Sequence, residues 1–161
     1  MTGPSFQRAI RTYVDTSVFG GCFDDEFAEY SNRFFERVRR GEILAIVSTA
    51  VSDELERAPS HVQALFDELR PLLDAVLPLD DDVVNLANAY IDAGVLQHSS
   101  LVDALHVAAA TLANVDLLVS WNFRHIVNFH RIHGFGGVNT LLGLRSFTIL
   151  SPREACDEES I

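Results

Sequence analysis

The chain has 161 residues, 48% of them hydrophobic, and this size suits one compact domain with a single core. Its 12 basic residues, all arginine, stand against 23 acidic ones, and a formal net charge of -11 argues against a protein that coats nucleic acid through a broad basic face. Cys22 and Cys156 form no zinc or redox motif, and no signal peptide or apolar run of roughly 20 residues occurs, so we expect a cytoplasmic protein with reduced thiols and no membrane segment.

Strand and helix patterns alternate along the chain. Residues 11–17 begin as a β-favouring run, and residues 27–38 space their apolar side chains as an amphipathic helix does. A continuous apolar run at 43–47 is typical of a buried parallel strand, and the helix after it stops before Pro59. Further helices are predicted at 62–73, 82–93 and 101–113, and further strands near 76–77 and at 117–120 and 147–150.

This alternation predicts the α/β fold class, with a central, mainly parallel sheet between layers of helices. No repeat or long linker divides the chain, so we expect one domain over residues 11–155, preceded by an N-terminal extension (1–10) and followed by an acidic tail (156–161). Ligands of such sheets bind beyond the carboxyl ends of the strands, so polar residues just after strands are the first candidates for a site.

Asp15 closes the first strand. A carboxylate at the end of a buried strand costs several kcal/mol unless it is paired, hydrogen-bonded or metal-bound. The alternative is a turn-forming aspartate that accepts hydrogen bonds from the next backbone amides. Thr16 and Ser17 fit both interpretations, because a hydroxyl can orient a carboxylate.

Glu54 is a weaker candidate, because it lies at the edge of the apolar stripe of its helix, three residues from Val51. A surface carboxylate is the commoner fate of such a residue.

Asp103 and His106 are the only polar interruptions early in an otherwise apolar helix, and their spacing of three places them on one face. A capping box with Ser100 would explain Asp103 but not His106. For His106 the alternatives are a hydrogen-bonded core histidine and a residue that contacts substrate or orients an acid.

Asn122 follows the strand at 117–120 and could offer a metal its carbonyl oxygen, or could form a turn or helix cap. Ser120 beside it is a plausible orienting hydroxyl. Arg124 could grip phosphate with its planar guanidinium, as could the arginines at 37, 39 and 40, although these three also suit a helix C-terminus.

Four segments, in this order and at domain-wide spacing, together resemble the successive motifs of the PIN-domain family: residues 14–19, 52–55, 103–108 and 118–123. The later segments 123–128, 137–139 and 149–154 resemble its VapC-like toxin ribonuclease branch. The resemblance runs from about residue 11 to residue 155, and its strength lies in the order of the motifs, since no single one is specific.

The resemblance implies a three-layer α-β-α fold and a metal-dependent endoribonuclease, the toxin of a type II toxin–antitoxin pair. It implies that Asp15, Glu54 and Asp103 bind Mg²⁺ or Mn²⁺, ions that prefer carboxylate oxygens. Asn122 stands where many members carry a fourth acid, so one or two ions are both open, and Asp116 precedes its strand and is no replacement. An RNA substrate, a small antitoxin partner and a homodimer are likewise implied.

Three alternatives have the same or a similar site. One is a PIN-like nuclease of RNA processing without an antitoxin. Another is a catalytically weak module that binds RNA or protein, which Asn122 and the acidic surface favour. A phosphatase with Asp15 as nucleophile is the third, although no convincing partner residues accompany it. The sequence does not specify which RNA is cut.

Overall fold

The computed structural model describes residues 8–157. Residues 1–7 and 158–161, which belong to the expected extension and acidic tail, lie outside the described residues. The first strand starts at Ile10, one residue earlier than the sequence indicated.

Five parallel strands form the central sheet, in the order β3-β2-β1-β4-β5. Their bounds are β1 Ile10–Val14, β2 Ile43–Ser48, β3 Ala75–Leu77, β4 Leu117–Val119 and β5 Thr148–Leu150. The chain leaves β1 toward β2 on one side and returns to β4 on the other, so the carboxyl end of β1 lies where the strand order reverses. Open parallel sheets bind their ligands at this point.

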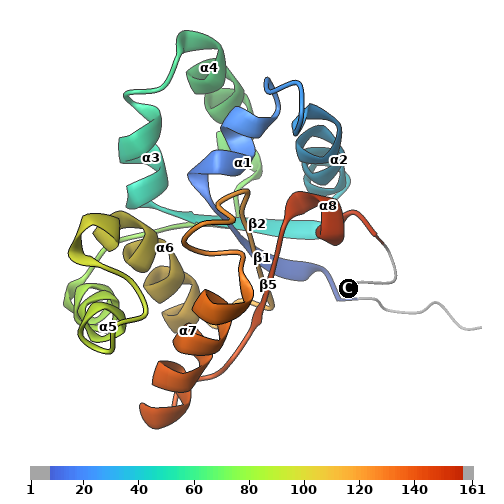
Figure 1. The fold of residues 1–161 in the computed structure, drawn as a ribbon. Coiled ribbons are helices and arrows are strands. Elements are labelled where there is room, and N and C mark those ends of the chain that lie inside the picture. The colour runs from blue at the N-terminus through green and yellow to red at the C-terminus, as the bar shows by residue number, and fades with distance from the viewer. Residues whose placement is uncertain (1–7, 158–161) are drawn as a thin grey trace, which may run out of the picture.

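Helices cover both faces of the sheet (Figure 1). Their bounds are α1 Thr16–Gly21, α2 Ala28–Arg39, α3 Thr49–Leu55, α4 Ser60–Leu69, α5 Asp81–Asp92, α6 Leu101–Leu112, α7 Phe129–Leu141 and α8 Pro152–Ala155, with short 3-10 turns at Arg70–Leu72 and His98–Ser100. In Figure 1, α1 to α4 lie above the sheet and α5 to α7 below it, with α8 beside α2. The expected three-layer α/β architecture is confirmed.

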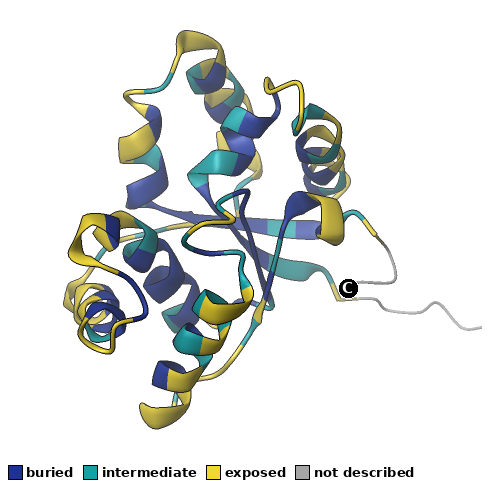
Figure 2. Ribbon diagram, in the orientation of Figure 1, coloured by how far each residue is buried: buried dark blue, intermediate teal, exposed yellow. Residues whose placement is uncertain are grey.

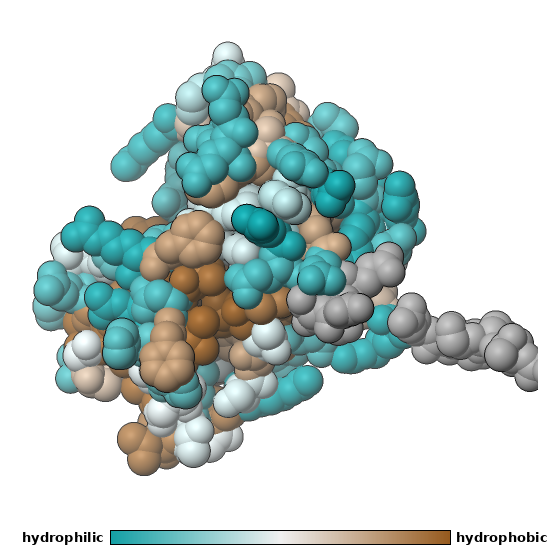
Figure 3. All heavy atoms as spheres, turned by 45° about the vertical axis from the view of Figure 1, so that its right-hand side comes forward, coloured by the Kyte–Doolittle hydropathy of each residue, from teal (hydrophilic) through white to brown (hydrophobic). Residues whose placement is uncertain are grey.

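The core lies along both faces of the sheet, where the strands and the inner sides of the helices are buried (Figure 2). Aromatic rings fill much of it, and those of Phe19, Phe34 and Phe35 contact one another above β1 and β2. Hydrophilic side chains cover most of the face drawn in Figure 3, and hydrophobic ones gather toward its centre. Among residues 8–157, no helix has the length and apolar character needed to cross a membrane.

The sequence did not predict α1, α7 or α8. Glycine disfavours helices, and α1 ends in Gly20 and Gly21 while α7 contains Gly134 and two more glycines. Gly134 serves packing, because a Cβ there would lie 2.7 Å from a methyl of Val95. The predicted helix 62–73 was too long: α4 ends at Leu69, and Pro71, which has no backbone N–H, lies in a 3-10 turn.

Candidate active site

A pocket of about 500 Å³ opens at the carboxyl end of β1. Three of the four acidic side chains that line it are the predicted ones, Asp15, Glu54 and Asp103. They come from the ends of different elements: Asp15 follows β1, Glu54 lies on α3, and Asp103 lies in the first turn of α6. The convergence expected from the sequence therefore occurs in the fold.

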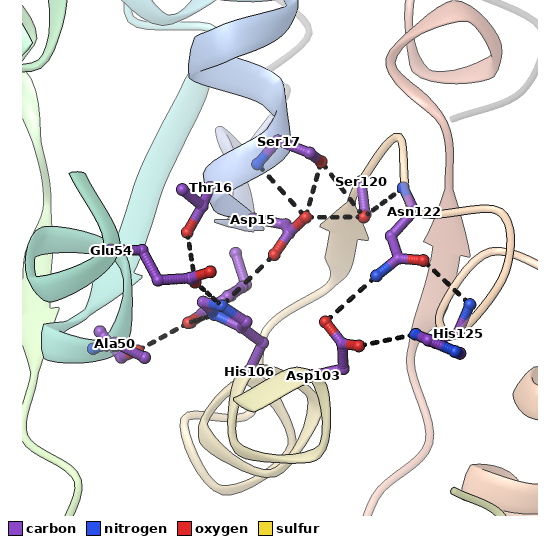
Figure 4. Close-up of polar contacts among 12 residues, drawn as sticks. Asp15, Thr16, Ser17, Ala50, Glu54, Asp103, His106, Ser120, Asn122 and His125 are labelled. Atoms are coloured by element: carbon purple, nitrogen blue, oxygen red, sulfur yellow. Dashed lines mark hydrogen bonds and ion pairs between the residues drawn. The ribbon is translucent and has the colours of Figure 1, made fainter. Parts of the chain in front are cut away.

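Asp15 is buried, and its two oxygens face different partners. Its Oδ2 accepts hydrogen bonds from the hydroxyls of Ser17 at 2.6 Å and Ser120 at 2.8 Å, and from the Ser17 backbone N–H at 3.4 Å. Its Oδ1 lies 3.5 Å from Nε2 of His106 (Figure 4). The turn-forming interpretation of Asp15 is confirmed, because it caps α1, and its place in the pocket lining keeps it a candidate ligand.

His106 lies between Asp15 and Glu54 and is only 1% exposed. Its Nε2 is 2.6 Å from Oε1 of Glu54, and its Nδ1 is 2.7 Å from the hydroxyl of Tyr13, which reaches Ser48 at 2.7 Å. Burial opposes protonation of the imidazole, but the charges of Asp15 and Glu54 outweigh it and raise the pKa of His106. Nε2 of His106 lies between the carboxylates of Asp15 and Glu54.

Glu54 is oriented from two sides. Its Oε1 accepts a hydrogen bond from the Thr16 hydroxyl at 2.8 Å besides the one shared with His106. Partial burial raises the pKa of Glu54, but these hydrogen bonds and the imidazole charge reverse the shift and lower it. Thr16 is therefore an orienting hydroxyl for Glu54, whereas Ser17 and Ser120 orient Asp15.

Asp103 faces the pocket from the opposite side. Its Oδ1 accepts a hydrogen bond from the Asn122 side-chain NH₂ at 3.1 Å, and its Oδ2 lies 2.9 Å from Nδ1 of His125. Burial and the charge of Asp15 raise the pKa of Asp103, against the opposing effect of His125. The Ser100 side chain makes no capping hydrogen bond to α6, so the capping-box explanation of Asp103 is wrong.

Asn122 forms the turn that was one of the two roles considered for it. Its side-chain oxygen accepts the backbone N–H of His125 at 2.9 Å, which shapes the turn after β4, while its NH₂ group holds Asp103. Because that oxygen is engaged, Asn122 acts here as a positioning residue for Asp103. Arg124 is exposed and does not line the pocket.

Sequence reasoning missed Tyr13 and the link between His125 and Asp103. His125 follows Asn122 by three residues, a spacing that brings it to the same turn, and this was the available signal. It also missed a second wall of the pocket, formed by Gly20, Gly21, Asp24, Phe27 and Trp121.

The donor atoms fit a hard divalent cation. Three carboxylates share one pocket, and the described residues that line it include no arginine, so the charge that raises the pKa of Asp103 has little compensation. In this arrangement the carboxylates turn toward His106 and His125, and no three histidine, cysteine, aspartate or glutamate side chains within residues 8–157 are grouped as a metal site.

No family model and no curated protein matches the chain. Among solved structures, a chain in the crystal structure of VapBC2 from Rickettsia felis bound to a promoter DNA fragment is similar to this chain. The match has a TM-score of 0.56 and 12% sequence identity, and it covers 88% of this chain and 98% of that chain. A chain of FitAcB from Neisseria gonorrhoeae matches with TM-score 0.57 and 13% identity over the same shares. At such identities the likeness shows a shared fold, which agrees with the fold implied by the PIN-domain resemblance.

Proposed function

We propose that this protein is a metal-dependent endoribonuclease of the VapC-like toxin type. The observation that carries the proposal is the meeting of Asp15, Glu54 and Asp103 in one pocket, since these are the residues that the sequence resemblance marks as metal ligands. The fold shared with VapBC2 and FitAcB supports the same assignment.

Asp15 and Asp103 would be the principal ligands of Mg²⁺ or Mn²⁺, with Glu54 as a third. When bound, the cation supplies Lewis-acid stabilisation of the phosphate oxygens and lowers the pKa of water for attack on phosphorus. The hydroxyls of Ser17 and Ser120 hold one oxygen of Asp15 in place, and the other faces Nε2 of His106. Asn122 holds Asp103 in the same way, so the two carboxylates are positioned before a ligand arrives.

In this proposal the imidazole of His106 is protonated and supplies a positive charge within the site. The protonated imidazole balances part of the negative charge of Asp15 and Glu54, which keeps the empty pocket compatible with a buried carboxylate. Its hydrogen bond to Tyr13 fixes the ring plane. His106 is therefore a positioning residue in this proposal and takes no proton from substrate.

A small antitoxin is the expected partner, and a homodimer the expected assembly, on the strength of the resemblance. An antitoxin that placed an arginine among these acids would neutralise them and block the ion. RNA as substrate, and Cys22 and Cys156 as free thiols, fit a cytoplasmic protein.

The test is cleavage of a mixed RNA pool by the wild type, Asp15→Asn and Asp103→Asn, each with and without Mn²⁺. We expect each substitution to lower the rate about a hundredfold to a thousandfold, because a bound cation supplies several kcal/mol of stabilisation. Asp116→Asn, a change of the same type at the opposite edge of the sheet, is the matched control and should cleave as the wild type does. Equal activity in all four proteins, or cleavage without metal, would refute the assignment.

A catalytically silent binding module is the second candidate. The observation in its favour is that Asn122, His106 and His125 already engage the three acids. Calorimetric titration with Mn²⁺ separates the two candidates. The nuclease requires heat of binding that disappears in Asp103→Asn, whereas the silent module requires none.

A further inference from the structure

Part of the lining of the pocket that holds the acids is aromatic. Phe27 precedes α2 and lines the pocket, half-buried, with its ring stacked on the indole of Trp121 at a centroid distance of 4.2 Å and an interplanar angle of 20°. Phe123 approaches both rings, at 6.5 Å from Phe27 and 6.1 Å from Trp121, and its side chain is 48% exposed. Three rings from two distant segments thus meet beside the acid cluster.

A hydrogen bond and close packing hold the aromatic rings in place. The indole N–H of Trp121 donates to the Ser31 hydroxyl at 2.8 Å, and the indole is buried. Gly21 lets α1 approach it, because a Cβ at this position would lie 2.6 Å from Nε1 of Trp121. Phe27 is therefore a ring on a rigid support, and it needs no reordering to receive a ligand.

The composition of this wall does not suit phosphate. Asp24 is its charged side chain, the described residues that line the pocket include no arginine, and the chain as a whole carries a net charge of -11. Acidic proteins gain little affinity from the phosphate backbone, which attracts Lys and Arg. Affinity for a nucleic acid must then come from uncharged contacts, and stacking of a base on an aromatic ring is the strongest of these.

Gly20 lines the pocket, and a Cβ there would meet no atom within 4 Å, so the space beside it is open. A pocket of about 500 Å³ falls in the usual range for small-ligand sites, which suits a nucleotide. Acids on one side and rings on the other match the two ends of a nucleotide, phosphate and base.

We propose that Phe27, backed by Trp121 and flanked by Phe123, is the stacking surface for an unpaired base of the RNA strand whose phosphate lies among the acids. The inference rests on the proposed nuclease function and adds to it a surface that would bind a base. A paired base is excluded, because in an A-form duplex both of its faces are already stacked and it cannot turn into the pocket.

The first test uses Trp121, the one tryptophan of the chain, as a built-in reporter of the wall. The wild type is titrated with adenosine monophosphate and, in parallel, with ribose 5-phosphate, which carries the same phosphate without the base. We expect the tryptophan fluorescence to change with the nucleotide and to stay constant with the sugar phosphate. An equal response to both, or to neither, overturns the proposal.

The second test measures binding and cleavage of a single-stranded RNA and of the same sequence as a duplex. Phe27→Leu keeps the bulk and removes the ring, and Phe123→Ala removes an exposed ring with little risk to folding. Phe129→Ala is the matched control, because Phe129 is 70% exposed and its ring contacts those of His130 and His133 instead of Phe27 and Trp121. Each pocket variant should raise KM for single strands about fivefold to a hundredfold at nearly constant kcat, the range measured for a stacked base, and the control should not.

The outcomes separate this proposal from the one it rests on. If the wild type cleaves RNA and both pocket variants keep its KM, the stacking surface is refuted and the nuclease stands. A duplex that is cleaved as well as the single strand also refutes the stacking surface, because the bases of a duplex are not free to stack on Phe27. If the wild type neither binds nor cleaves either RNA, the nuclease and the stacking surface fall together.

Discussion

A single carboxylate at one edge of the sheet and a carboxylate cluster at the opposite edge have different kinds of partner. At the amino edge, Asp116 precedes β4 and accepts hydrogen bonds from the Arg8 guanidinium at 2.7 Å and the Arg11 backbone N–H at 3.0 Å, with Arg145 at 3.5 Å. At the carboxyl edge, Asp15 and Asp103 are held by hydroxyls, an amide and two histidines.

The pKa values of Asp116 and Asp103 shift in opposite directions, in agreement with this difference in partners. Burial would raise the pKa of Asp116, but Arg11 and Arg8 outweigh it and the pKa is lowered. Burial raises the pKa of Asp103, and the charge of Asp15 raises it further. We interpret a carboxylate that is paired with arginine as structural. A carboxylate that lies beside another acid is instead a candidate to bind a cation from solution.

Removal of His106 should have the largest effect on stability. His106→Ala leaves Asp15 buried without its cation, and we expect a loss of about 3 kcal/mol in the free energy of unfolding, measured by urea denaturation. The matched control is His125→Ala, which also removes a histidine from a carboxylate but at a site that is 26% exposed, and which should cost about 1 kcal/mol. Equal losses would show that the two histidines carry equal weight and that the pocket is not organised around His106.

The close packing of the pocket end can be tested at two neighbouring glycines. Gly21→Ala places a Cβ 2.5 Å from the Ser31 hydroxyl, so we expect a loss of about 2 kcal/mol and a changed Trp121 fluorescence. Gly20→Ala meets no atom within 4 Å and should stabilise α1 by up to about 1 kcal/mol. Similar melting temperatures for the two variants would contradict the packing described here.

A further acidic residue in the pocket should increase the difference in electrostatics between the carboxyl edge and the amino edge of the sheet. Asn122→Asp replaces the NH₂ group that donates to Asp103 with a second carboxylate, so the metal-free protein should lose about 1 kcal/mol. Binding of Mn²⁺ should become about tenfold tighter, because ligand charge sets the affinity of such sites. Calorimetry and thermal melts with and without Mn²⁺ measure both effects. Weaker Mn²⁺ binding would place Asn122 outside the ion's reach.

The smallest effect concerns pH, and its sign should differ between the two edges. The lowered pKa of Asp116 stabilises the fold at pH values above the unfolded pKa of about 3.9, and this stabilisation disappears as pH falls through the folded pKa. The raised pKa of Asp103 means that its ionised form destabilises the metal-free fold at neutral pH, a cost that vanishes as pH falls through its folded pKa.

Relative to the wild type, Asp116→Asn should therefore be less stable at pH 7 by about 1 kcal/mol, and Asp103→Asn in the absence of metal should be equal or more stable. Both differences should shrink toward zero in acid. Urea denaturation of the three proteins at several pH values measures them, and a destabilised Asp103→Asn at pH 7 would reverse the assignment of the two edges.

The sequence predicted more of the fold than of the contacts within the site. Short apolar runs located all five strands, and apolar periodicity located five of the helices, because burial selects apolar residues along a strand and along one face of a helix. Ser151 and Glu154 form a capping box with Pro152 at the start of α8, a signal that was present in the sequence but was taken only as part of the family resemblance. The glycines of α1 and α7 hid those helices, because their purpose, close approach to Trp121 and to Val95, exists only in the folded chain.

The sequence by itself determined that Asp15 and Asp103 lie at the carboxyl edge of a parallel sheet, because chain order and strand direction fix which edge each loop occupies. Only the tertiary structure decided their partners. That His106 bridges Asp15 and Glu54, that His125 and Asn122 hold Asp103, and that Phe27 faces them depends on contacts between segments far apart in the chain. Side-chain distance sets electrostatic and stacking energies, and no local pattern in a sequence encodes it.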